Sequence, residues 1–114
     1  MQTLDFNSIE LPRLAVIFRD EARTRVTVKT PTLAMIEKLQ ANRKTLNATL
    51  RGDEDGAIAA TYDMIAEFIS HNEEGTTITG ADLREKYGWD DLGCLVVFMQ
   101  AYLSLIETIQ NAKN

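Results

Sequence analysis

The sequence has very few of the residues that most often carry chemistry. Among its 114 residues are one cysteine, Cys94, and one histidine, His71, which lie 23 positions apart. One cysteine excludes an internal disulfide. A metal site needs several ligands at workable spacing, and a nucleophile needs an adjacent base. The six glycines are scattered and form no phosphate-binding loop. We therefore expect no catalytic, cofactor-binding or metal site, and no enzyme.

Targeting segments and a basic face are also missing. The first ten residues have neither the basic region nor the apolar core of a signal peptide. No apolar run approaches the roughly 18 residues of a membrane span. The net charge of −5 argues against nucleic acid as a partner. The sequence thus predicts an intracellular, soluble protein, in line with its ordinary composition.

The charge is divided unequally along the chain. Residues 1–50 carry a net charge of +3 and residues 51–114 a net charge of −8. Two interpretations remain open: the halves attract each other between copies of the chain, or both are simply solvated faces. At this length we expect one domain spanning 1–114, β-rich over 1–30 and α-helical over 31–114.

The first thirty residues have the pattern of a small antiparallel sheet. Thr3 to Phe6 and Ile9 to Leu11 alternate, and Leu14 to Phe18 is a short apolar run. Arg23 to Thr30 alternates again, with Val26 and Val28 on one side. The last two runs are joined by about four polar residues and predict a hairpin. The expected sheet has two or three strands and needs helices on its apolar face.

Helical spacing follows to the end of the chain. We expect helices over about 31–50, with Thr30 as the N-cap, over about 55–71, over about 79–87 and over about 89–110. Thr79 and Asp82 match a capping box, and Gly88 suits a left-handed end. Asp53 or Asp55 caps the second helix; a calcium loop is the alternative, but its other ligands are missing. The fold class is α+β, with three main helices and one short one.

The last helix is the most apolar part of the chain. Its apolar side chains cover well over half of its circumference, which indicates either a central core helix or a second apolar face for a partner. Asp90 and Asp91 are placed to cap its start, and Cys94 reads as a small buried hydrophobe. Two interpretations stay open for its five most prominent residues, namely plain core or protein binding. These residues are Leu95, Phe98, Met99, Tyr102 and Leu105.

Taken in order, five segments of the chain resemble one family over nearly the full length. They are LDFNSIELPRL, VTVKTPTLAMIEKLQA, the helix around Tyr62 that ends in HNEEG, TITGADLREKYGWDDL and VVFMQAYLSLIETI. In this order and spacing, the sequence resembles the tail assembly chaperones of long-tailed bacteriophages and prophages of Gram-positive bacteria.

The resemblance implies a non-enzymatic protein of the bacterial host cytoplasm that takes part in virion assembly. Such chaperones coat the long, largely helical tape measure protein before the tail tube forms, and they tend to self-associate. The implied partners are therefore the tape measure protein and further copies of the chain, with no membrane, nucleic acid or cofactor. Two alternatives remain: a structural tail component, or a small acidic adaptor or regulator that binds a protein.

Overall fold

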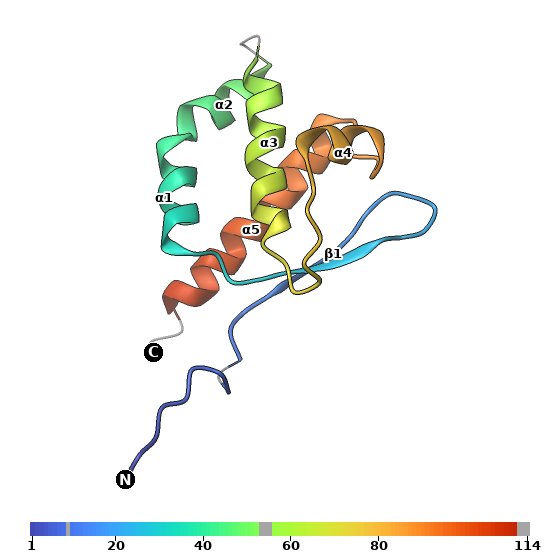
Figure 1. Ribbon diagram of the computed structural model, residues 1–114. Coiled ribbons are helices and arrows are strands. Elements are labelled where there is room, and N and C mark those ends of the chain that lie inside the picture. The colour runs from blue at the N-terminus through green and yellow to red at the C-terminus, as the bar shows by residue number, and fades with distance from the viewer. Residues whose placement is uncertain (9, 53–55, 112–114) are drawn as a thin grey trace.

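The β structure of the chain is one antiparallel hairpin near its beginning. The computed structural model describes residues 1–8, 10–52 and 56–111. Strands β1 (Leu14–Ile17) and β2 (Arg25–Val28) pair with Val16 opposite Val26. Val16, Val26 and Val28 are buried, so the predicted hairpin and its inward-facing side are confirmed. Five helices follow within the described residues, and the layout is α+β (Figure 1).

The described residues before β1 form no strand, so the prediction of β structure there is wrong. Asp5 to Ser8 makes a turn in which the Ser8 N–H donates to the Asp5 carbonyl at 3.1 Å. Leu4, Phe6 and Leu11 are exposed. We call residues 1–13 the N-terminal arm, and its first residues project from the body of the protein (Figure 1). Alternation makes a strand only where a neighbouring strand supplies hydrogen bonds.

The predicted helix over 31–50 is two helices, α1 (Leu33–Ala41) and α2 (Arg43–Arg51). Asn42 separates them, with φ −104° and ψ 16°, and its side-chain amide donates to the Lys38 carbonyl at 2.7 Å. Asparagine competes with the helix in this way, because its side chain bonds to nearby backbone. The N-cap is Thr32, whose hydroxyl accepts from the Met35 N–H, and not Thr30 as predicted.

The middle of the fold is helix α3 (Ala57–Ser70), which packs against α2, α4 and β2. Eight of its residues are buried, whereas Ile58 is exposed. Asp53 and Asp55, the predicted caps and the alternative calcium ligands, lie outside the described residues. In the described part of the chain, no group of three His, Cys, Asp or Glu residues is placed to bind a metal ion.

The short helix α4 (Gly80–Glu85) begins as predicted and ends two residues before the predicted end at residue 87. Thr79 and Asp82 form the capping box, with the two side-chain bonds at 3.0 and 3.1 Å. Gly88 has a φ of 77°, and the Trp89 N–H then donates to the Leu83 carbonyl at 2.8 Å. This closing turn brings Trp89 into the core before the last helix, α5 (Leu92–Asn111).

Six aromatic rings form a continuous row through the core. Neighbouring ring centroids lie 4.2 to 5.7 Å apart, which is the range of favourable ring contacts. The row connects the hairpin, the α4 corner, α5 and α3, in the order Tyr87, Phe18, Trp89, Phe98, Tyr102 and Phe68.

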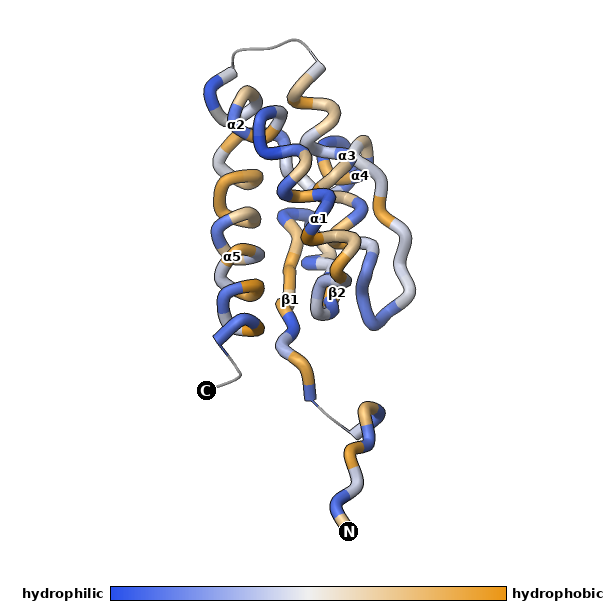
Figure 2. Tube along the Cα trace, turned by 90° about the vertical axis from the view of Figure 1, so that its left-hand side faces the viewer, coloured by the Kyte–Doolittle hydropathy of each residue, from blue (hydrophilic) through white to orange (hydrophobic). Residues whose placement is uncertain are grey.

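Helix α5 is long and apolar enough to cross a membrane by length and composition, although no segment of that kind was predicted from the sequence. A core helix of a globular domain passes the same test. Here a third of an 18-residue stretch of α5 is buried inside the protein, and α5 lies beside β1 (Figure 2). The apolar content of α5 is therefore used at least in part by the core.

Candidate functional site

The five residues of α5 predicted either to bind a partner or to form the core are all buried. Their exposed fractions range from 1 to 7 %. In the folded single chain, they are covered by the hairpin and the other helices, although Phe98 and Met99 each also line a groove on the surface. They are Leu95, Phe98, Met99, Tyr102 and Leu105.

The remaining apolar residues of α5 lie on its two flanks. Cys94, Val97 and Ala101 follow at steps of three and four and face β1. Val96 and Leu103 lie on the opposite flank and face α1 and α2. The apolar face of α5 is wide because it combines a buried centre with two less covered flanks. A groove runs along each flank.

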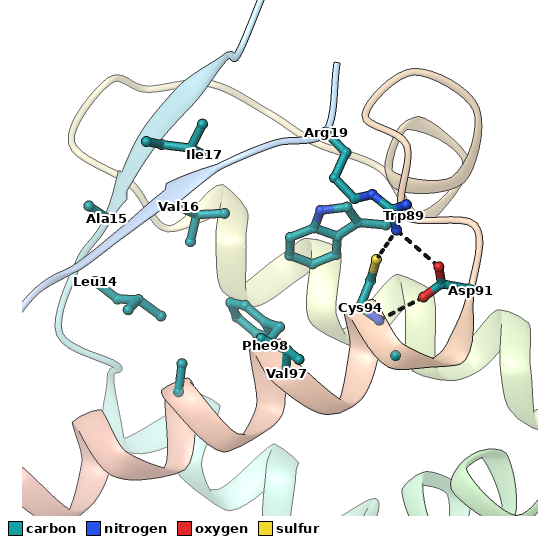
Figure 3. A pocket seen from close by; sticks show the side chains of 12 residues that line it. Leu14, Ala15, Val16, Ile17, Arg19, Trp89, Asp91, Cys94, Val97 and Phe98 are labelled. Atoms are coloured by element: carbon teal, nitrogen blue, oxygen red, sulfur yellow. Dashed lines mark hydrogen bonds and ion pairs between the residues drawn. The ribbon is translucent and has the colours of Figure 1, made fainter. Parts of the chain in front are cut away.

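The first groove lies between β1 and α5 and has a volume of about 450 Å³. We call it the β1–α5 groove. Val16, Trp89 and Phe98 are its buried residues, while Ile17 and Val97 are exposed beside it, Val97 to 66 %. Figure 3 shows these side chains between the strand and the helix. The lining is mainly apolar, so the groove suits an apolar side chain.

One wall of this groove is an unpaired strand edge. The Phe18 N–H donates to the Thr24 carbonyl at 2.9 Å. Because the backbone groups of successive residues in an antiparallel strand point to alternate sides, those of Ala15 and Ile17 point away from β2. No described segment pairs with β1 on that side. The outer edge of β2 is different, because residues 71–74 cover it through bonds such as Glu73 N–H to the Thr27 carbonyl at 2.9 Å.

A polar cluster closes one end of the β1–α5 groove. Nη1 of Arg19 lies 2.9 Å from Oδ2 of Asp91 and 2.9 Å from Sγ of Cys94. Oδ1 of Asp91 accepts the Cys94 N–H at 3.0 Å, so the predicted cap at the start of α5 is confirmed for Asp91. The bond from Arg19 holds the pKa of Asp91 below its ordinary value. The cluster fastens the end of the hairpin to the start of α5.

The cluster also includes the thiol of Cys94, in the first turn of α5. The side chain bonded to the Cys94 sulfur is the Arg19 guanidinium, which stays protonated. The arrangement therefore favours a structural contact. Arg19 was missed at the sequence level, because its partners are 72 and 75 positions away and no local pattern marks them.

The second groove lies between α5 and the pair α1 and α2, with a volume of about 620 Å³. We call it the α1–α5 groove. Its apolar residues are buried or half-buried, except Leu103, which is 48 % exposed. They are Ile36, Leu39, Leu46, Val96, Met99, Leu103 and Ile106. Polar side chains surround them, namely Gln40, Arg43, Asn47, Gln100, Glu107 and Gln110.

An apolar centre with a polar rim is the usual arrangement of a protein interface. The two grooves differ in the partner that each suits. Two helical walls suit a helix, and a wall with a free strand edge suits an extended segment. Comparisons of this chain with protein families, with curated proteins and with solved structures found no match.

Proposed function

We propose that this chain is a non-enzymatic tail assembly chaperone of the bacterial host cytoplasm. In this proposal, the α1–α5 groove binds an apolar helix face of the phage tape measure protein and keeps that protein soluble during tail assembly. The resemblance of the sequence to this family supports the class of function. The observation that carries the proposal is an apolar groove between helices, with Leu103 exposed in it.

The dimensions of the groove suit a helical client. Its lining on α5 runs from Val96 to Gln110, which is about 20 Å at 1.5 Å per residue. A client helix of about four turns fits along this length and offers apolar side chains at helical spacing. Arg43 and Glu107 on the rim offer charges of both signs, so the rim does not restrict the client to one sign of charge.

Co-expression with a fragment of a candidate tape measure protein tests this proposal. The native chain is expected to form a stable complex that keeps the fragment soluble, measured by light scattering after size-exclusion chromatography. Leu103→Asp is expected to abolish the complex, since it places a charge in the groove at an exposed position that does not support the core. Ser104→Asp is the matched control, because Ser104 is the next residue of α5, is exposed and does not line the groove.

The two variants make the result specific. If the fragment stays insoluble with the native chain, the chaperone function is refuted for that client. If Leu103→Asp and Ser104→Asp both retain the complex, the client does not bind in the α1–α5 groove. Far-ultraviolet circular dichroism on each variant confirms that the fold is intact.

A further inference from the structure

Most of the exposed large apolar side chains of this protein lie either on the N-terminal arm or at the β1–α5 groove. Ten large apolar side chains are exposed among the described residues, and six of them belong to the N-terminal arm or to the β1–α5 groove. Those six are Met1, Leu4, Phe6, Leu11, Ile17 and Val97. Monomeric proteins rarely leave such a concentration uncovered, so it marks an interaction site.

The arm has the pattern of a strand but no strand partner. Leu4 and Phe6 are two positions apart, are 70 % and 77 % exposed, and would point to the same side of an extended segment. Their spacing along a strand is about 6 to 7 Å. Val97 and Ala101, on the helical wall of the groove, are separated by about 6 Å, one turn of α5.

The outer edge of β1 lacks a neighbouring strand among the described residues. It is a strand of four residues with an unpaired outer side, next to an apolar groove. A segment added along β1 would pair with the backbone of Ala15 and Ile17 and place alternate side chains in the groove. The arm supplies Leu4 and Phe6 at alternate positions, which share one side once the turn at Asp5 to Ser8 extends, and the edge supplies the missing strand neighbour.

The base of the arm directs it away from its own β1 edge. The Thr30 hydroxyl donates to the Pro12 carbonyl at 2.6 Å, and Arg13 forms an ion pair with Glu73 at 2.9 Å. Thr30 and Glu73 lie on the β2 side of the hairpin, opposite to α5. The arm then continues beyond the body of the protein (Figure 2). A second copy is therefore the molecule whose groove it is placed to reach.

We propose that the N-terminal arm of one copy docks on the outer edge of β1 of a second copy, with Leu4 and Phe6 in the β1–α5 groove. Exchange in both directions gives a two-fold dimer, and exchange in one direction gives an open chain of copies. This interface uses the flank of α5 that the proposed client site does not use. The inference does not rest on the chaperone function, since it needs no client.

The test is the oligomeric state of the full-length protein, measured by analytical ultracentrifugation over a range of concentrations. The native chain is expected to self-associate. Leu4→Asp combined with Phe6→Asp is expected to weaken association by at least tenfold, because burial of either side chain is worth about that factor. Val97→Asp is also expected to weaken association, because it places a charge in the β1–α5 groove. Leu33→Asp is the control for nonspecific hydrophobic association, since Leu33 is 78 % exposed but lies neither in the N-terminal arm nor in the β1–α5 groove.

Mixing the two variants distinguishes an arm that docks on a second copy from an arm that folds back onto its own groove. The arm variant retains a native groove, and Val97→Asp retains a native arm. Each is expected to be monomeric alone, and the mixture is expected to form an equimolar complex of twice the mass of one chain. A native chain that stays monomeric, association that persists in the arm variant, or a mixture without the complex would overturn the proposal.

Discussion

Tyr102→Phe is expected to stabilise this protein, although it removes an atom from the core. The Tyr102 side chain is 1 % exposed, and its hydroxyl is buried with no hydrogen-bond partner in the described part of the chain. A buried hydroxyl that loses its bonds to water without replacing them costs about 1–3 kcal/mol. Phenylalanine keeps the ring stacked on Phe68 and Phe98 and removes that cost.

Tyr62 provides a matched control. Its hydroxyl is also buried, but it donates to the Trp89 carbonyl at 2.6 Å. Tyr62→Phe removes the donor and leaves the carbonyl unpaired, so it is expected to lower the free energy of unfolding by about 1 kcal/mol. The same chemical change is thus expected to have opposite signs at the two positions.

Urea and thermal unfolding, followed by circular dichroism, measure both effects. For a domain of this size, 1 kcal/mol corresponds to about 4 °C in Tm. Tyr102→Phe is expected to raise Tm by several degrees and Tyr62→Phe to lower it by a similar amount. If Tyr102→Phe lowers Tm as Tyr62→Phe does, the Tyr102 hydroxyl has a partner and the reasoning fails.

Alkaline pH gives a second readout of the same hydroxyl. Burial raises the pKa of Tyr102 above its ordinary value of 10.0. The unfolded chain then ionises first, so this group leaves the free energy of unfolding unchanged below pH 10 and lowers it as the pH rises further. Tyr102→Phe is expected to reduce this alkaline loss, measured as the change in unfolding free energy between neutral and alkaline pH.

Two further predictions concern the backbone and acid pH. Gly88→Ala is expected to cost more unfolding free energy than Gly52→Ala in urea unfolding, because both glycines have positive φ but only at Gly88 would the new Cβ lie 2.9 Å from Cβ of Arg19. Equal costs would show that the contact with Arg19 is relieved freely. Stability is also expected to fall as the pH drops through and below about 4, because bonds to the carboxylates of Asp91 and Glu74 hold their pKa values below the ordinary 3.8 and 4.5. Asp91→Asn is expected to weaken that acid dependence, and an unchanged acid profile would refute the role of this carboxylate.

Local signals predicted the parts of the fold that local chemistry determines. The hairpin followed from alternation, the start of α4 followed from the capping box at Thr79, and the left-handed turn after it followed from Gly88. The break at Asn42 was missed, because asparagine is tolerated within helices and only the packing of α2 on α3 distinguishes the two outcomes. The arm was misread, since its alternating pattern does not reveal whether a neighbouring strand exists.

The width of its apolar face pointed to α5 as the candidate site, and both grooves lie along this helix. Which flank is covered depends on where β1 and α1 pack, and this follows from contacts across the chain. The most conspicuous residues, such as Phe98 and Tyr102, are in the core, and the smaller Val97 and the less prominent Leu103 are exposed.

The position of Trp89 gives this protein an intrinsic fluorescent reporter. It is the single tryptophan of the sequence, its ring contacts Phe18 and Phe98 at tilted angles, and it lines the β1–α5 groove. Its emission is sensitive to the polarity around the indole ring, and nearby tyrosine rings are positioned to transfer excitation energy to it. An arm that docks in the groove would displace water beside Trp89 and shift its emission to shorter wavelength. Association is thus measurable by titrating the unlabelled protein in dilute solution.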